Sequence, residues 1–260
     1  MLPIGNTPVV TIDDIWCKCE HLNPTGSIKD RVAYEMMMDT RPGDIVIEAT
    51  SGNTGVSVAW MAACRQAHAK IYCPAQTSLM KQKLMIAYGA EIIDYERNAD
   101  NEIMPLTTIK DCIDCATRDK TGTYLNQFSN LTNYWAQVKM AQEVRTICPD
   151  AIVTGIGTGG TLAGLYTIFP NATFYTWDAD YSIEGTSDGV ELPLKPPKCN
   201  LYVIRLSLPS IEEVQKYLAT KYGYLVGLSS AANFYAASMI KYKHKKILTI
   251  FPDTGYRYLL

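Results

Sequence analysis

The sequence lacks an excess of either charge. Its 260 residues include 24 Lys and Arg against 26 Asp and Glu, which gives a formal net charge of -2. Nucleic acids and anionic membranes attract proteins through extended basic surfaces, whereas this sequence holds a single short basic run at residues 241–246. We expect this run to be a solvated connection between a helix and a strand, and we expect no nucleic-acid partner.

Long apolar runs are also missing. The sequence contains no stretch that approaches the ~20 apolar residues needed by a membrane-spanning helix. Its first residues, MLPIGNTPVV, show neither the basic region nor the small-residue cleavage site of a secretory signal. We therefore expect a cytoplasmic protein without a membrane partner.

The eight cysteines are too sparse for a disulfide scaffold. Cys17 and Cys19 alternate along an expected strand, and Cys112 and Cys115 form a CxxC pair in an expected helical stretch at 104–119. Two such pairs can build a zinc site, but these pairs are far apart in sequence and neither lies in a zinc-ribbon turn. We expect reduced, partly buried thiols and no metal.

Apolar strand-like runs alternate with helical runs along the chain. This alternation predicts an α/β fold of mainly parallel sheets covered by helices, with ligands at the carboxyl ends of the strands. The expected strands are residues 7–12, 15–20, 44–49, 69–74, 90–95, 151–156, 172–177, 201–206 and 246–251. The expected helices are residues 29–38, 56–69, 79–89, 104–119, 132–147, 210–223 and 231–242.

The segment NPTGSIKDR places Lys29 where a loop becomes a helix. Pro24 and Gly26 are turn residues, and Ser27 suits the position that caps the helix. A lysine in the first helical turn opposes the helix dipole. Lys29 is therefore either an ordinary surface residue or a lysine that loses its charge to do chemistry, and its neighbours alone leave both interpretations open.

A first small-residue loop, EATSGNTG at residues 48–55, follows an expected strand and opens an expected helix. Its two glycines let a ligand approach the backbone, and its hydroxyl side chains flank the N–H groups of a helix start. The alternative is a tight turn capped by Asn53. The density of small polar residues favours a loop that binds a carboxylate or a phosphate.

A second loop, GIGTGGT at residues 155–161, matches G-x-G-x-x-G after a strand, and Asp178 lies about twenty residues further on. This is the dinucleotide-binding pattern, so an NAD-dependent oxidoreductase is one interpretation. Thr158 and Thr161, however, offer two hydroxyls that suit a terminal phosphate better than a dinucleotide pyrophosphate. The loop also lies past the middle of the chain, whereas the dinucleotide pattern usually opens a nucleotide domain.

Several motifs, taken together and in this order, resemble one family. They are IGNTPVV, NPTGSIKDR, EATSGNTG, AYGAEII, NQF, GIGTGGTLAG, IEGTSDG, YGYLVGLSSAA and FPDTGYRYL. The chain resembles the fold-type II pyridoxal-phosphate enzymes, specifically the cysteine synthase (O-acetylserine sulfhydrylase) and cystathionine β-synthase group. The resemblance implies a tryptophan synthase β-like fold with two lobes, a larger one from residues 1–30 with 128–260 and a smaller one from residues 31–127.

The resemblance also implies which residues hold the cofactor, pyridoxal 5'-phosphate. Lys29 would form the Schiff base and act as the catalytic base on the substrate Cα proton. Asn53 would contact the phenolic oxygen, and Thr254 would meet the pyridine nitrogen where the family usually has serine. The residues expected to bind the phosphate are Gly157, Thr158, Gly159, Gly160 and Thr161.

A further set of residues is implied for the amino-acid substrate. Gly185 would lie in the loop that faces the substrate amine. The residues expected at the α-carboxylate are Thr50, Ser51, Gly52, Thr54 and Gln127. Two positions in GLSSAAN, Ala231 and Asn233, depart from the family because smaller residues are usual there.

The activity implied by the resemblance is that of a cysteine synthase, a transferase of cysteine biosynthesis. It would replace the leaving group of O-acetylserine, or of a similarly activated serine, with sulfide or another small sulfur donor through an aminoacrylate. The alternatives are a cystathionine β-synthase-type reaction of serine with homocysteine, a sensing or binding protein with little catalysis, and the NAD-dependent oxidoreductase. The resemblance also implies a homodimer and, as a candidate partner, the C-terminal peptide of serine acetyltransferase.

Overall fold

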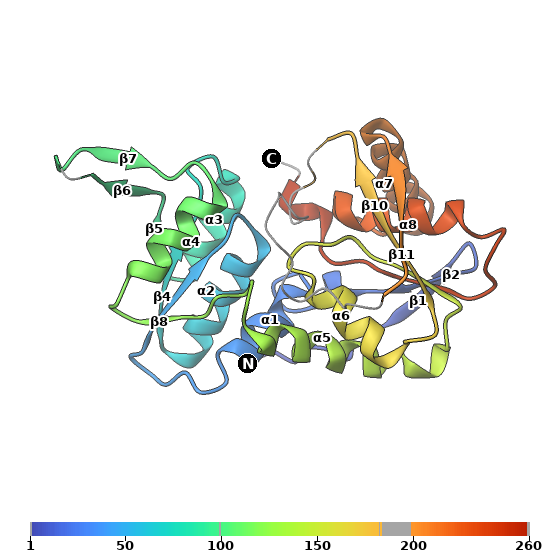
Figure 1. Ribbon diagram of the computed structural model, residues 1–260, viewed down its shortest axis with the longest axis horizontal. Coiled ribbons are helices and arrows are strands. Elements are labelled where there is room, and N and C mark those ends of the chain that lie inside the picture. The colour runs from blue at the N-terminus through green and yellow to red at the C-terminus, as the bar shows by residue number, and fades with distance from the viewer. Residues whose placement is uncertain (1, 99, 182, 184–198, 259–260) are drawn as a thin grey trace. The chain divides into compact units, whose positions relative to one another are not determined.

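The chain divides into two units, each built around one main sheet (Figure 1). The structure, a computed structural model, describes residues 2–98, 100–181, 183 and 199–258. The first unit is Lys29–Asn133, and the second combines Leu2–Ile28 with Tyr134–Leu260. Each unit has its own sheet, so each is described separately.

The second unit contains a six-stranded sheet in the order β1-β2-β12-β9-β10-β11. Within it, β1 and β2 pair antiparallel, and each of the other neighbouring pairs is parallel. The strands are β1 (Val9–Ile12), β2 (Ile15–Lys18), β9 (Ala151–Val153), β10 (Thr173–Ala179), β11 (Leu201–Leu206) and β12 (Ile247–Ile250).

Helices cover both faces of this sheet (Figure 1). Ala151 and Val153 of β9 join the apolar cluster that contains residues of α7 and α8, whereas Ile152 joins the cluster that contains residues of α5 and α6. Alternate side chains of a strand point to opposite faces, so a strand buried on both sides is apolar throughout. The helices are α5 (Leu131–Glu143), α6 (Gly160–Ile168), α7 (Leu208–Tyr222) and α8 (Leu228–Met239), with 3-10 turns at Glu20–Leu22, Arg145–Ile147 and Gly255–Tyr258.

The first unit contains a parallel four-stranded sheet in the order β5-β4-β3-β8. A separate antiparallel ribbon pairs β6 with β7, and its residues are exposed. The strands are β3 (Ile45–Ala49), β4 (His68–Tyr72), β5 (Glu91–Ile93), β6 (Tyr95–Arg97), β7 (Ile103–Pro105) and β8 (Thr123–Tyr124). The helices are α1 (Lys29–Met36), α2 (Asn53–Arg65), α3 (Leu79–Ala87) and α4 (Ile109–Arg118).

The predicted α/β class with mainly parallel sheets is confirmed, but some local predictions were wrong. The helix expected from residue 104 begins at Ile109, because Ile103–Pro105 pairs with β6 and Thr108 caps the helix in a reciprocal capping box with Asp111. Ser27, expected to cap α1, lies two residues before the first residue of the helix and forms an isolated β-bridge with Asp253.

The remaining expectations concern thiols, metals and membranes. All eight cysteines are free, and those expected in pairs, Cys17 with Cys19 and Cys112 with Cys115, are buried. Within the described ranges, no group of three or more His, Cys, Asp or Glu side chains is placed to hold a metal ion. In the same ranges, no helix combines the length and the apolar character needed to cross a membrane.

Candidate functional site

The second glycine loop connects the carboxyl end of β9 to the start of α6. Gly159 precedes the helix with a φ of 87°, a left-handed conformation that glycine adopts without steric penalty. N–H groups in a first helical turn have no carbonyl partner in their own helix and, together with the helix dipole, attract anions. Thr158 is buried, and its hydroxyl accepts a hydrogen bond from the Gly160 N–H at 3.4 Å. The predicted phosphate residues Gly157, Thr158, Gly159, Gly160 and Thr161 therefore share one helix start.

Asn233 of α8 holds the beginning of this loop. Its Oδ1 accepts hydrogen bonds from the Gly155 N–H at 2.7 Å and from the Trp177 Nε1–H at 2.7 Å. Its Nδ2 donates to the Ile250 carbonyl at 2.8 Å. A Cβ on Gly155 would lie 2.9 Å from the Trp177 ring, so only glycine fits there. The departure from the family at Asn233 is thus a fully buried brace that links the loop to β10 and β12.

Thr254 lies after β12 and is fixed by its backbone. Its N–H donates to the Gly26 carbonyl at 3.0 Å, and it forms a β-bridge with Val226. Gly26 has a φ of 84°, and a Cβ there would lie 2.7 Å from the Thr254 Cγ2. The Thr254 hydroxyl accepts a hydrogen bond from the Tyr256 N–H at 3.3 Å. A hydroxyl held in this way can donate its own proton to an acceptor such as a pyridine nitrogen.

Lys29 is the first residue of α1 and is half-buried. The two residues immediately before it belong to the second unit and are held there by backbone hydrogen bonds. The Ile28 N–H donates to the Pro252 carbonyl at 2.8 Å, and Ser27 forms a β-bridge with Asp253. Residues 27 and 28 are therefore anchored, within the second unit, to the segment that follows β12.

A buried polar network supports the start of the NPTGSIKDR segment. Lys18 is 1% exposed, and its Nζ donates to Glu143 at 2.6 Å and to the Thr7 carbonyl at 2.5 Å. Glu20, which is also buried, accepts hydrogen bonds from Thr7 Oγ1 at 2.6 Å and from Asn23 Nδ2 at 2.7 Å. A buried ion requires such partners because burying it unpaired is costly. The pairing therefore fixes Asn23, the first residue of the NPTGSIKDR motif.

The first glycine loop connects β3 to α2 in the other unit. Thr54 Oγ1 donates to Gln127 Oε1 at 2.6 Å, and Gln127 Nε2 donates to the Ala49 carbonyl at 3.2 Å. Thr50 Oγ1 accepts a hydrogen bond from the Gly52 N–H at 3.1 Å. Thr50, Thr54 and Gln127 are all buried. The structure thus brings Gln127 against the loop, although 73 residues separate it from Thr54.

The remaining predicted residues of this loop belong to both sets. Of the substrate set, Ser51 is half-buried and Gly52 is buried. Asn53, predicted for the cofactor, is the first residue of α2, where its carbonyl accepts a hydrogen bond from Ser57 Oγ at 3.1 Å. Gly185 lies outside the described residues. Asp178, the acidic residue of the dinucleotide pattern, is exposed on β10, the strand next to β9. Both interpretations of the second loop therefore share this local geometry.

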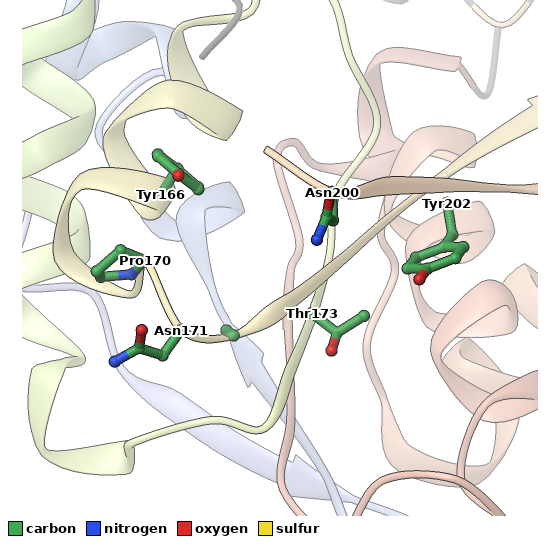
Figure 2. Close-up of a pocket in the computed structure, with 7 residues that line it drawn as sticks. Tyr166, Pro170, Asn171, Thr173, Asn200 and Tyr202 are labelled. Carbon is green, nitrogen blue, oxygen red and sulfur yellow. The ribbon is translucent and has the colours of Figure 1, made fainter. Parts of the chain in front are cut away.

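A small cavity of about 170 Å³ lies at the opposite end of α6 from the glycine loop. Figure 2 shows its labelled lining residues, which come from the end of α6 and the beginnings of β10 and β11. They are Tyr166, Pro170, Asn171, Ala172, Thr173, Asn200 and Tyr202. In a parallel α/β sheet, ligands bind at the carboxyl ends of the strands, so this cavity is not the candidate site.

Comparisons with known proteins discriminate between the two interpretations. The family described as pyridoxal-phosphate dependent enzyme matches residues 1–253. Cysteine synthase B of Campylobacter jejuni is 31% identical over 98% of this chain and 95% of its own length. A hydrogen sulfide-producing enzyme of Fusobacterium nucleatum has a TM-score of 0.84 at 27% identity, covering 98% of this chain and 97% of its own. An O-acetylserine dependent cystathionine beta-synthase of Helicobacter pylori has a TM-score of 0.80 at 29% identity, covering 98% and 95%. The resemblance inferred from the motifs is confirmed.

Proposed function

The chain belongs to the pyridoxal-phosphate dependent enzymes, and from this premise we propose that it is a cysteine synthase. It replaces the leaving group of O-acetylserine, or of a similarly activated serine, with sulfide or another small sulfur donor, and it releases L-cysteine. The observation that carries the proposal is that one chain has two glycine loops of complementary chemistry. One suits a phosphate and the other suits a carboxylate, the two anionic groups that a cofactor and an amino acid would bring.

The residues of the second loop fit the cofactor phosphate. Residues 155–161 contain only glycine, isoleucine and threonine, so no carboxylate within the loop repels an anion. The N–H groups at the start of α6 and the hydroxyls of Thr158 and Thr161 are the donors that a phosphate needs. Thr254 offers a neutral hydroxyl to the ring nitrogen, and Asn53 offers an amide to the phenolic oxygen.

Each remaining step is assigned to residues of this chain. When bound, pyridoxal phosphate supplies the electron sink that stabilises negative charge at the substrate Cα. Lys29 anchors the cofactor and accepts the Cα proton on Nζ, for which its amine must be neutral. Its position in the first turn of α1 favours the neutral form because the helix dipole disfavours a cation there. The neutral hydroxyl of Thr254 would donate a hydrogen bond to the ring nitrogen of the cofactor.

The first loop orients the amino acid by its α-carboxylate. The N–H groups at the start of α2 and the hydroxyls of Thr50 and Ser51 are suitable donors. The hydrogen bonds from Thr54 to Gln127 and from Gln127 to Ala49 fix the side chains before substrate arrives, which reduces the ordering cost of binding. The residues assigned to this role are Thr50, Ser51, Gly52, Thr54 and Gln127, with Gly185 assigned to the side of the substrate amine.

A second candidate differs only in the sulfur nucleophile. The similar Helicobacter pylori structure is that of an O-acetylserine dependent cystathionine beta-synthase. A reaction that uses homocysteine in place of sulfide would need the same Lys29, the same phosphate loop and the same carboxylate loop. The nucleophile therefore has to be assigned by assay.

The test is turnover by purified, cofactor-loaded protein. We expect L-cysteine from O-acetylserine and sulfide, and no product from the Lys29→Ala variant. Product from serine or O-acetylserine with homocysteine, and none with sulfide, would favour the cystathionine β-synthase reaction. A yellow protein that turns over no donor would favour the sensing interpretation, and a colourless protein that binds NADH would favour the oxidoreductase.

Location and assembly are proposed from the family resemblance. We propose a cytoplasmic homodimer, with the C-terminal peptide of a serine acetyltransferase as a candidate partner. Light scattering coupled to size-exclusion chromatography measures the oligomeric state. Titration with the peptide, followed by the absorbance of the cofactor, measures peptide binding. A monomer, or a peptide that leaves the cofactor spectrum unchanged, would contradict the corresponding part.

A further inference from the structure

Glu48 is a buried carboxylic acid that the reaction described above does not use. It lies in β3 with 0% exposure, between apolar neighbours in the sequence IVIEA. Burial raises the pKa of Glu48 to about 8, although hydrogen bonding from the backbone amides of Ala49 and Gln127 acts in the opposite direction. At neutral pH the side chain is therefore mostly the uncharged acid.

The contacts of Glu48 join two segments that are far apart in sequence. Its Oε1 accepts a hydrogen bond from the Ala49 N–H at 3.0 Å, and the Gln127 backbone amide faces the same carboxyl group. Ala49 immediately precedes the loop at residues 50–54, and its carbonyl accepts the hydrogen bond from Gln127 Nε2. Glu48 thus lies where the β3 strand end meets the segment of Gln127.

Stability alone does not explain a carboxyl group at this position. Glu48 Oε2 is buried and has no hydrogen-bond partner among the residues that the structure describes. The hydroxyl of Tyr124 on β8 is likewise buried without a hydrogen-bond partner among the described residues. The pKa of Tyr124 is raised, mainly by burial and secondly by the nearby Glu48 carboxyl group. A buried polar atom left unsatisfied costs free energy that an apolar side chain of similar volume would avoid.

We propose that Glu48 is a positioning residue for the substrate carboxylate: it holds the end of β3, and with it the loop at residues 50–54, against the segment that carries Gln127. The proposal rests on the assignment of that loop to the substrate carboxylate under the proposed function. Glu48 does not touch the substrate. It acts through the backbone amides of Ala49 and Gln127.

The experiment compares two small ligands on the cofactor-loaded protein. L-Alanine carries the carboxylate but no leaving group, whereas ethylamine carries only the amine. Both are titrated against the cofactor absorbance, and the ratio of the two affinities reports the carboxylate site alone. A general loss of stability or of cofactor contacts would move both affinities together and leave the ratio unchanged.

Three variants and one control are needed. Glu48→Gln keeps the shape and the acceptor oxygen of the neutral acid, so we expect the ratio to stay within about twofold of the wild-type value. Glu48→Leu removes the acceptor, and Glu48→Asp shortens the side chain. For both we expect the ratio to fall about tenfold, the size of one lost buried hydrogen bond. Val46→Ala, two residues earlier on the same face of β3 and also buried, should lower the melting temperature without changing the ratio.

The outcomes separate the two proposals. If Glu48→Leu fails to fold, the affinity ratio of Glu48→Asp tests the role of Glu48, and a near wild-type ratio in Glu48→Gln shows that the acceptor oxygen is sufficient. A wild-type protein that binds L-alanine better than ethylamine, with an unchanged ratio in the folded Leu and Asp variants, would overturn the role of Glu48 alone. A wild-type protein that shows no preference for L-alanine would overturn the carboxylate site, and the role of Glu48 with it.

Discussion

The two glycine loops are built alike but are held in different ways. Each follows a parallel strand, opens a helix and has a buried polar side chain bonded to a backbone N–H at the strand end. At the second glycine loop, proposed to bind the phosphate and called the phosphate loop below, this side chain is Asn233, whose amide makes three hydrogen bonds. At the first glycine loop, proposed to bind the carboxylate and called the carboxylate loop below, it is Glu48, whose Oε2 has no hydrogen-bond partner in the described part of the chain. One loop therefore depends on a group of constant charge, and the other depends on a group that titrates.

The largest effect should come from removing Lys29, which belongs to neither loop. Lys29→Ala removes the proposed cofactor anchor and base, so we expect turnover of O-acetylserine with sulfide to fall by at least about a thousandfold. The melting temperature should change little, because Lys29 is half-buried in a first turn and alanine is a good helix former. Turnover close to the wild-type rate would remove Lys29 from its assigned role.

The next prediction uses pH to distinguish the two buried side chains that hold the loops, Glu48 and Asn233. Because burial raises the folded-state pKa of Glu48 to about 8 from its ordinary value of 4.5, its contribution to stability is complete below about pH 4.5. It is lost as the pH rises towards 8, with a slope of up to about 1.4 kcal/mol per pH unit. The facing Tyr124 hydroxyl stays protonated in this range because its pKa is raised.

The measurement is thermal unfolding of the wild type and of Glu48→Gln between pH 5 and 8. We expect the wild type to lose stability relative to the variant as the pH rises, because glutamine cannot ionise. Other titrating groups are common to both proteins and cancel in the difference. Parallel curves would mean that Glu48 does not carry its proton into the folded state. Asn233→Gln is not a suitable comparison because its longer side chain would strain a filled site.

The Asn233 brace should matter at every pH. Asn233→Leu leaves the Gly155 and Trp177 donors unpaired in a buried site, so we expect a loss of about 3 kcal/mol in the free energy of unfolding and weaker cofactor retention. Ser238→Ala on the same helix is the control, because it removes only a local bond to the Tyr235 carbonyl. Equal losses from the two variants would contradict the role of Asn233 as a brace.

Contacts between residues far apart in the sequence, such as those of Asn233, could not be predicted from the sequence. The alternation of strands and helices, the two loops and the position of Lys29 followed from local patterns that need no partner to be recognised. Asn233 was noticed only as a departure from the family, because its hydrogen bonds reach β10 and β12, which lie far away in the sequence. The strand at Thr123–Tyr124 was missed for the same reason, since two residues show no periodicity until they pair with β3.

A smaller and more selective effect is expected in the carboxylate loop. Thr54→Val removes the donor to Gln127 Oε1 and leaves that buried oxygen without the 2.6 Å bond. We expect the KM for O-acetylserine to rise about tenfold, with kcat and cofactor retention close to wild type. Steady-state kinetics measure KM and kcat, and dialysis against cofactor-free buffer measures cofactor retention. A Thr54→Val variant that loses cofactor as well as substrate affinity would show that this loop also affects cofactor binding.

The smallest effect is expected in the phosphate loop, where cofactor affinity rather than KM should change. Thr161→Val keeps the shape of the side chain but removes one hydroxyl from the start of α6, where the backbone N–H groups remain. Because the backbone donors still bind the phosphate, we expect only a severalfold loss of cofactor affinity, measured by the same dialysis. The KM for O-acetylserine on fully loaded protein should not change. If Thr54→Val raises only KM and Thr161→Val weakens only cofactor retention, each loop serves the anion assigned to it. A rise in KM in the loaded Thr161→Val protein would instead show that the second loop also contacts the amino acid, and the division of labour between the loops would have to be redrawn.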